Sequence, residues 1–454
     1  MTNRACRLAG RPLTFAMIGL AAALAACSAD HPTAPALSDA VQANQGRGRD
    51  GGDVPSVVSV RVARMLPNDV LATVAGVPVF NGGFGSALDR SPFRPDELYS
   101  LTDRGPNISG SGDDKLFPVP DFHPQVGVFE RRGDRLVRSR VIVLRDAAGK
   151  ALTGLPPAGT GNTGEIPRTL TGALLPNDPN GIDSEGLRVM RDGSFWVSDE
   201  YGPFLVHFDR SGRTIERDSP TGGPHPLPAV LLRRQANKGM EGLASIRDGR
   251  ELVGMMQNPL VNPDKAAAKA SRLLRIVFVD AMTGKTRQYA YLMDDASYGV
   301  SDIESVSPTE FLVDERDGKF FGDPSGPAAQ KKIYLIDVSK ATDISDPANS
   351  AAGLTIGGKT LEQMSDADLS ANRIVPVTKT LVVDLLAHGY THDKAEGVAL
   401  IDGGRTIAVS NDDDFGVTDD GDQHLLQKLL PSGLVDHNEV WFFTLARSLT
   451  SRGK

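Results

Sequence analysis

Short apolar runs punctuated by Gly, Asp and Pro fill the chain from about Val57 onward, and few stretches have a helical period. This alternation predicts β-strands joined by tight turns. One phrase recurs, in which a short acidic turn leads into a strand and a second apolar strand ending in polar residues follows. Its first part reads DSEGL at 183–187, KGMEGL at 238–243, SDIESV at 301–306 and KAEGVA at 394–399. Its second part reads LYSLTDRG at 98–105, FWVSDEYG at 195–202, ELVGMMQN at 251–258, EFLVDERD at 310–317 and TIAVSNDD at 406–413.

A hairpin signature follows most copies, and such cycles of strand, strand and hairpin are typical of four-stranded blades around an axis. The sequence therefore predicts an all-β fold, a single β-propeller of six blades, with loop inserts at about 104–180 and 341–375. Residues 57–62 and 70–80 would complete the sixth blade by closing against the strand at 439–445. Five and seven blades stay open as alternatives.

The start of the chain has the layout of an export signal. Arg4, Arg7 and Arg11 precede an apolar run, Leu13 to Ala26, that is too short to span a bilayer. The run ends in LAAC, which resembles the lipobox of bacterial lipoproteins and implies cleavage before Cys27 and lipidation of its sulfur. We predict a lipoprotein signal peptide at 1–26, a flexible tether at 27–54, the propeller at 55–447 and a C-terminal tail at 448–454. The expected location is the cell envelope, lipid-anchored at a membrane surface; an ordinary signal peptide is the alternative.

Composition narrows the classes of function. The net charge is −8, and loss of three arginines and no acids with the signal takes it to −11. Nucleic-acid binders normally carry a basic excess, so we expect no nucleic-acid partner, and membrane contact only through the lipid. The chain has 2 cysteines, one in the signal and one lipidated, which excludes a disulfide scaffold. We expect a monomer.

The recurring acids carry the predicted chemistry. If the phrase repeats in space, each blade delivers acids to one mouth of the central channel, with Glu185, Glu241, Glu304 and Glu396 in equivalent positions. A site made of oxygen donors without Cys indicates Ca²⁺, and Mg²⁺ or Mn²⁺ are the less favoured alternatives. The candidate metal ligands are Asp103, Asp183, Glu185, Asp199, Glu200, Glu241, Glu304, Asp314, Glu396 and Asp412. Acids beside Gly can also be mere turn formers, although a turn gives no reason for the longer Glu in each copy.

Basic residues interleave with the same phrases. Arg104, Lys238 and Lys394 would orient a small anionic ester, such as a phosphate bridged by the metal. A buried Glu without metal contact could act as general base. The candidate catalytic residues are therefore Glu241, Glu185, Arg104, Lys238 and Lys394. Local pairing of the cations with neighbouring acids is the alternative, and His392 is a further candidate for the mouth.

Three segments resemble the phytase-like family, also called the esterase-like activity of phytase family. They are GIDSEGL with FWVSDEYGPFL within 181–205, NKGMEGLA at 237–244, and KAEGVA with VSNDDDFG within 394–416. The likeness runs over most of residues 75–447. It implies a secreted or surface-attached β-propeller, distantly related to Ca²⁺-dependent phytases, with a phosphoesterase or esterase role. Two hypotheses follow: a metal-dependent hydrolase of phosphate or other esters, or a non-catalytic Ca²⁺-stabilised propeller that binds envelope or extracellular ligands.

Overall fold

The computed structural model describes residues 54–450, which form five four-stranded blades. Blade 1 consists, from the axis outward, of β4 (Ala87–Arg90), β5 (Glu97–Leu101), β8 (Gln125–Arg132) and β9 (Arg135–Val143). Blade 2 consists of β11 (Ser184–Val189), β12 (Phe195–Asp199), β13 (Phe204–Phe208) and β14 (Thr214–Asp218). Blade 3 consists of β15 (Met240–Ile246), β16 (Glu251–Met256), β17 (Leu273–Asp280) and β18 (Thr286–Leu292). Blade 4 consists of β19 (Gly299–Ser305), β20 (Glu310–Arg316), β21 (Lys331–Asp337) and β24 (Thr378–Asp384). Blade 5 consists of β25 (Val398–Ile401), β26 (Thr406–Ser410), β29 (Glu439–Leu445) and β1 (Val57–Leu66).

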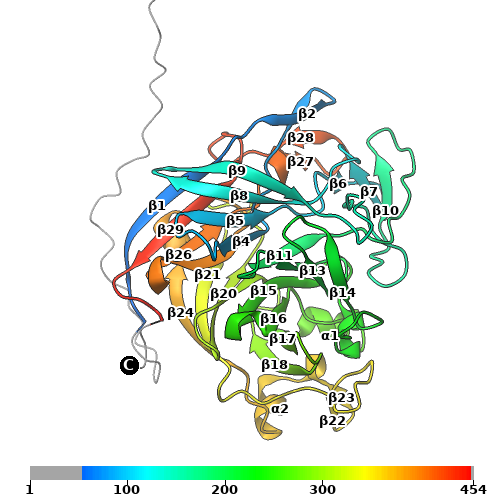
Figure 1. Cartoon of the computed structure of the whole chain (residues 1–454). Coiled ribbons are helices and arrows are strands. Elements are labelled where there is room, and N and C mark those ends of the chain that lie inside the picture. Colours follow the sequence, from blue (N-terminus) through cyan, green and yellow to red (C-terminus); the bar gives the residue numbers. More distant parts are fainter. Residues whose placement is uncertain (1–53, 451–454) are drawn as a thin grey trace, which may run out of the picture. The chain divides into compact units, whose positions relative to one another are not determined.

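The innermost strands contact one another in a closed ring, in the order β4, β11, β15, β19, β25 and back to β4. Figure 1 shows the N-terminal strand β1, in blue, running beside the C-terminal strand β29, in red. The predicted all-β propeller is confirmed, and its ring closes as expected, because the N-terminal β1 pairs antiparallel with β29 from Val57↔Leu445 to Arg64↔Glu439. The described residues contain five blades rather than six, since β1 completes the blade that β25 begins. At its end β1 also pairs parallel with β9, which joins blades 5 and 1 into one eight-stranded sheet. Of the two segments expected in a sixth blade, residues 57–62 lie in β1, and residues 70–80 form a separate hairpin, β2 (Val70–Val74) with β3 (Val77–Phe80).

The hydrophobic core lies between the blades. Five clusters of buried apolar side chains each join two neighbouring blades, so every blade is covered on both faces. This explains the near-continuous apolar character of strands such as β12, all of whose residues are buried. Trp196 and Trp441 belong to two of these clusters, between blades 2 and 3 and between blades 4 and 5. Blades packed face to face in this way fix the axis around which the inner strands present their ends.

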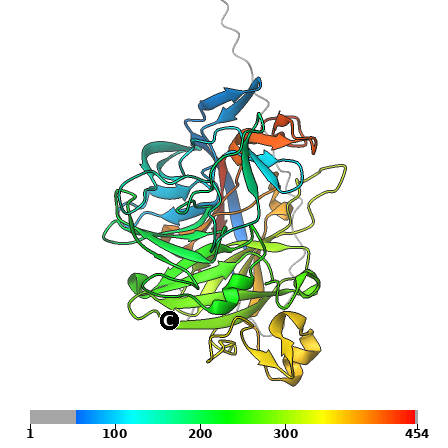
Figure 2. The ribbon, with the colours of Figure 1, turned by 90° about the vertical axis from the view of Figure 1, so that its right-hand side faces the viewer.

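Two groups of insertions extend the propeller (Figure 2). The cap comprises β2–β3, the sheet of β6 (Ile108–Ser109), β7 (Asp114–Phe117) and β10 (Ile166–Thr169), and the hairpin of β27 (Val417–Asp419) and β28 (Leu425–Gln427). These three pieces share a small apolar cluster that includes Val79, Leu116 and Phe415. The insert at 341–375 packs on blade 3. It contains β22 (Thr355–Ile356), β23 (Lys359–Thr360), η3 (Leu361–Gln363) and α2 (Asp366–Ala371).

The remaining helical elements are short. They are α1 (Lys265–Ala270), η1 (Ala229–Arg233), η2 (Arg247–Gly249), η4 (Leu386–His388), η5 (Asp402–Gly404) and η6 (Asp414–Gly416). Among residues 54–450 there is no helix with the length and apolar character that a membrane span requires. Cys27, the predicted signal peptide at 1–26 and the predicted tether up to residue 53 fall outside the described residues.

Candidate functional site

A charged pocket of about 540 Å³ lies at one end of the propeller axis, where the chain enters the inner strands and leaves the second strands. Its acidic residues are Asp103, Asp183, Glu185, Glu200, Glu241, Asp317, Glu396, Asp412, Asp414 and Asp419. Its basic residues are Arg104, Lys115, Lys238, Arg316 and Lys394. Acids outnumber bases, so the pocket favours cations while cationic side chains remain available to an anion.

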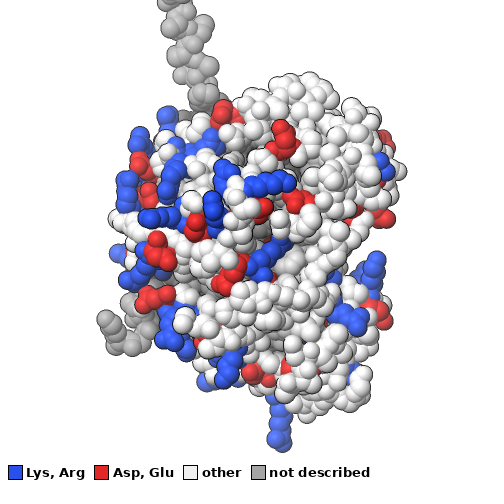
Figure 3. Space-filling view, turned by 45° about the vertical axis from the view of Figure 1, so that its right-hand side comes forward, with Lys and Arg blue, Asp and Glu red and all other residues white. Residues whose placement is uncertain are grey.

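The outer surface has a different distribution of charge. On the face of the molecule that Figure 3 shows, basic side chains are interleaved with acidic ones on the left, and few charged side chains lie at the upper right. Arginines of the outer strands pair locally, as Arg131 does with Asp402 at 3.0 Å and Arg132 with Glu130 at 2.7 Å. The pocket is therefore where like charges accumulate.

The Glu–Gly pair of the repeated phrase explains why three glutamates meet there. Glu185 and Glu241 each stand at a β-bulge, where the pairing of the inner strand with the second strand shifts register. The following glycine faces the next blade, since a Cβ at Gly242 would lie 2.7 Å from the backbone nitrogen of Ile303. Any side chain at that position would push the two blades apart. The Glu of the phrase thus places a carboxylate in the pocket, and the Gly that follows it allows the inner strands to pack closely. Glu396 supplies the third of these carboxylates.

The fourth glutamate is a correction to the predicted ring. In blade 4 the register shifts between Val300 and Ile303, which places Ser301 in the pocket lining and puts Asp302 where the other blades have glycine. Glu304 lies further along β19 and lines a second pocket at the opposite end of the axis. The bulge falls at the same place as in blade 2, but here it holds Ser301. Glu304 stands three positions later, where blade 2 has Arg188, so the predicted ligand lies at the other end of the propeller.

Asp199 and Asp314 also do not line the pocket. Asp199 accepts a hydrogen bond from Arg217 at 3.1 Å, and burial raises its pKa to about 7. Asp314 is fully buried with neither carboxylate oxygen hydrogen-bonded, and that burial raises its pKa well above the usual range. In blade 2 the next residue, Glu200, reaches the mouth instead, because successive side chains of a strand face opposite ways. In blade 4 the pocket residue is Arg316, two positions beyond Asp314 at the end of the strand. The pocket residues at or just past the ends of the second strands are Arg104, Glu200, Gln257, Arg316 and Asp412.

Three of the predicted ligands form the tightest group. Carboxylate oxygens of Asp183, Glu185 and Glu200 all lie within 4.8 Å of one another, and all three side chains are buried. Oxygens on opposite sides of one Ca²⁺ are about 4.6–5.2 Å apart, so this group can share an ion. The buried atom Glu241 Oε2 has no hydrogen-bond partner and is free to face a cation. Asp183 Oδ2 also accepts no hydrogen bond, and it already faces Arg104 Nε at 3.5 Å.

Burial and mutual repulsion disfavour ionisation of these acids. Burial, reinforced by Glu241 and Asp183, raises the pKa of Glu185 well above its usual range, and burial with Glu241 does the same for the pKa of Glu200. Burial and the charge of Glu396 raise the pKa of Glu241 to about 8, and burial and Asp183 raise that of Asp103 to about 8. A bound cation would remove this penalty by neutralising the charges in place.

The predicted cations differ in how firmly they are held. Arg104 donates to Glu165 at 2.9 Å and to Asn237 at 3.0 Å and is almost fully buried. Lys394 donates to Asp412 at 2.7 Å and to Asp414, so its pairing is local. The exposed Lys238 donates to the amide oxygen of Gln257 at 3.2 Å and not to a carboxylate. Lys238 is therefore the cation most available to an incoming anion.

Sequence reasoning missed several pocket residues. Lys115, on β7 of the cap, is half-buried, and its desolvation together with the charge of Arg104 lowers the pKa of its ammonium to about 8. Lys115 stands in an insert that carries no repeat, so no spacing pointed to it. The same insert supplies Glu165, which does not line the pocket but pairs with Arg104 at 2.9 Å. Gln257 ends the second strand of its repeat and could have been found by aligning the five copies.

His392, the further candidate for the mouth, lies in a buried ion-pair network outside the pocket lining. Its Nδ1 is 2.6 Å from Asp436 Oδ1 and its Nε2 is 3.3 Å from Glu439 Oε2. Burial opposes the charge on this ring, but the hydrogen bonds to the two carboxylates outweigh burial and raise the pKa of His392 to about 9.

This network predicts a loss of stability at alkaline pH. A histidine whose pKa is higher in the folded chain stabilises it fully below the unfolded pKa of about 6.5, and the contribution disappears as pH rises through 9. Over that range we expect the free energy of unfolding to lose on the order of 3 kcal/mol relative to His392→Gln. Urea unfolding at pH 6 and pH 9.5 measures the difference. Equal pH dependence in both proteins would contradict it.

Comparisons with known proteins relate this chain to a sequence family and to solved β-propellers. A family model described as phytase-like, esterase-like activity of phytase, matches residues 80–415. An uncharacterized secreted protein of Arthroderma benhamiae is 27% identical over 345 residues, which cover 60% of this chain and 66% of the relative's own length. Among solved structures, the calcium-binding protein regucalcin of Agrobacterium tumefaciens is 10% identical over 84% of this chain and 95% of that chain, with a TM-score of 0.32. The β-propeller domain of Cps50 (Swd1) from Myceliophteria thermophila is 11% identical over 83% and 100%, with a TM-score of 0.32.

Proposed function

The chain belongs to the phytase-like family, and we propose from this premise and the pocket's geometry that it is a Ca²⁺-dependent hydrolase of phosphate or related esters. The observation that supports the proposal best is the convergence of Asp183, Glu185 and Glu200 within 4.8 Å, beside cations that can contact an anion. Paired carboxylates and cations in one cavity suit a substrate that is negatively charged and binds partly through metal. Ca²⁺ is preferred over Mg²⁺ or Mn²⁺ because the donors are buried oxygens of several residues.

We assign the ligand role to that trio, and a bound Ca²⁺ would neutralise charge on the ester oxygens. Lys238 would bind the substrate anion, because its ammonium has no carboxylate partner in the described structure. Arg104 and Lys394 would position it from fixed locations at the pocket wall. Lys238 and Lys394 belong to the recurring phrases, and Arg104 follows the second strand of blade 1.

Glu241 is the proposed general base. Gln257 Nε2 donates to its Oε1 at 2.6 Å, which fixes the carboxylate, while Oε2 stays without a partner. Without a cation the pKa of Glu241 is raised to about 8. A Ca²⁺ ion bound nearby would lower it, so that the carboxylate is ionised and can accept a proton near neutral pH. Oε2 would accept the proton of the attacking water.

Turnover tests this proposal. The purified full chain with Ca²⁺ should hydrolyse an aryl phosphate or phytate, lose the activity with excess EDTA and recover it when Ca²⁺ is added back. The reason is that the buried carboxylates repel one another without a cation and the anionic substrate then meets a negative pocket. Absence of turnover on every phosphate and carboxylic ester tested, with Ca²⁺ shown to be bound, would contradict the catalytic part.

The second candidate function is a Ca²⁺-stabilised propeller without catalysis that binds envelope or extracellular ligands. The observation that favours it is Arg104, whose guanidinium is already engaged by Glu165 and Asp183. It predicts a rise in melting temperature with Ca²⁺ and no hydrolysis. In either case we propose an exported monomer that contacts membranes only through lipid on Cys27. The description of the relative in Arthroderma benhamiae as secreted supports the export alone.

A further inference from the structure

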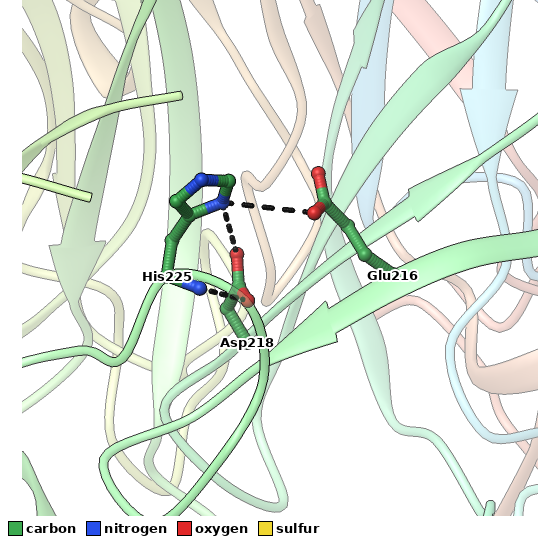
Figure 4. Close-up of side chains that lie close together, drawn as sticks. All are labelled: Glu216, Asp218 and His225. Atoms are coloured by element: carbon green, nitrogen blue, oxygen red, sulfur yellow. Dashed lines mark hydrogen bonds and ion pairs between the residues drawn. The ribbon is translucent and has the colours of Figure 1, made fainter. Parts of the chain in front are cut away.

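A second cluster of ligand-type side chains stands away from the pocket, at the outer edge of blade 2. Glu216 and Asp218 are on the edge strand β14, and His225 is on the loop that follows (Figure 4). The loop returns over the strand and is held there, because the backbone nitrogen of His225 donates to Asp218 Oδ1 at 2.9 Å. The imidazole is thereby directed at both carboxylates.

The distances from the His225 ring to the two carboxylates are too long for hydrogen bonds. His225 Nδ1 is 3.6 Å from Glu216 Oε2 and 3.6 Å from Asp218 Oδ2. Nδ1 is closed off from solvent and has no hydrogen-bond partner, and the Asp218 side chain whose Oδ2 faces it is only 2% exposed. A buried polar atom without a partner calls for a physical reason, since nearly all such atoms are paired.

The same distances suit ligands of one metal ion. Zn²⁺ binds His nitrogen and carboxylate oxygen at about 2.0–2.2 Å, so two ligands at tetrahedral angles are about 3.3–3.6 Å apart. We infer that Glu216, Asp218 and His225 form a binding site for a divalent transition-metal ion, Zn²⁺ in the first place, with one position left for water. The nitrogen donor separates it chemically from the all-oxygen pocket, which suits Ca²⁺.

Neighbouring residues support the site. His207 Nδ1 lies 3.6 Å from the other oxygen of Glu216, and the His207 ring stacks on Trp196 with centroids 4.4 Å apart. The stacking holds this imidazole in place next to Glu216. On the loop side, Gly284 of the β17–β18 turn comes close to His225, since a Cβ at Gly284 would lie 3.2 Å from His225 Cα. A metal here would fasten blade 2 to the loop that contacts blade 3, which is a stabilising role independent of hydrolysis.

Metal binding to the full chain tests the inference. After treatment with EDTA and in the presence of excess Ca²⁺, one equivalent of Co²⁺ should give the visible absorption bands of a tetrahedral nitrogen–oxygen site, and Zn²⁺ should displace it. At 100 times its dissociation constant Zn²⁺ should raise the melting temperature by about 3 °C, the shift that ligand binding gives a chain of this size. Absence of a Co²⁺ spectrum would overturn the inference.

Variants distinguish a metal site from a simple ion-pair cluster. His225→Gln should lose the Co²⁺ spectrum and the Zn²⁺ shift, whereas His424→Gln should keep both, because exposed His424 forms an ordinary pair with Asp420 at 2.8 Å. If His225→Gln fails to fold, Glu216→Gln gives the same readout. Unchanged Co²⁺ binding in the folded variant would overturn the inference in favour of an ion-pair cluster. Glu185→Gln should retain Co²⁺ binding even if the pocket proves to lack hydrolase activity.

Discussion

Glu185→Gln is expected to lower both Ca²⁺ affinity and hydrolysis by at least 100-fold. Glu185 belongs to the only group of three buried pocket acids in the described structure whose oxygens lie within 4.8 Å of one another. Gln keeps the size of the side chain but supplies a weaker neutral oxygen and an NH₂ group that repels the cation. Calorimetry of Ca²⁺ binding and phosphatase kinetics measure the two effects, which should fall together if they share one site.

A matched control keeps this result specific. Glu130→Gln makes the same chemical change on β8, where Glu130 pairs with Arg132 at 2.7 Å away from the pocket. Ca²⁺ affinity and turnover should stay within twofold of the parent protein in this variant. Retention of tight Ca²⁺ binding by Glu185→Gln would show that the cation binds elsewhere, whereas loss of binding with full turnover would separate catalysis from the metal.

Replacing Arg188 with Met is expected to cost about 3–5 kcal/mol of unfolding free energy. This buried arginine extends from β11 across the axis and donates to backbone carbonyls of Leu88 in blade 1 at 3.2 Å and of Ile303 in blade 4 at 2.6 Å. It also pairs with Glu304 at 3.1 Å and with Asp302 at 3.5 Å. Met fills similar volume but leaves two buried carboxylates and two carbonyls without their donor.

Chemical denaturation measures that loss, and the neighbouring arginine supplies the control. Arg191 pairs with Asp248 at 3.1 Å, but both side chains are at least 75% exposed, so Arg191→Met should cost less than about 1 kcal/mol. The double variant Arg188→Met with Glu304→Gln should recover part of the stability, because one unpaired charge is removed. A cost below about 1 kcal/mol for Arg188→Met would show that it does not hold the blades together.

Much of the pocket could be predicted because the repeat is short and two constraints act on it, namely the close contact between blades at the glycine and the placement of the acid in the pocket. Glycine is needed where an inner strand contacts the next blade. The Glu before that glycine in DSEGL, KGMEGL and KAEGVA therefore has the same position in each inner strand. SDIESV departs from this pattern, because Asp302 stands in place of the glycine. Its carboxylate bridges two blades by accepting hydrogen bonds from Leu243 N at 3.3 Å and Val398 N at 2.9 Å. The glutamate of SDIESV was misplaced because, without the glycine, nothing in the sequence shows that Ser301 and not Glu304 occupies the position of Glu185.

By itself, the sequence determined that this chain is an all-β repeat whose acids recur at strand ends, because the alternation of apolar and polar residues and the Glu–Gly pair act over a few neighbouring positions. Tertiary structure alone decided the number of blades, since only the pairing of β1 with β29 shows which blade the N-terminal strand completes. It also decided that Lys115 enters the pocket and that His225 meets two carboxylates of β14. Those contacts depend on how inserted loops pack against blades, which is set by burial of apolar surface over long distances in the chain.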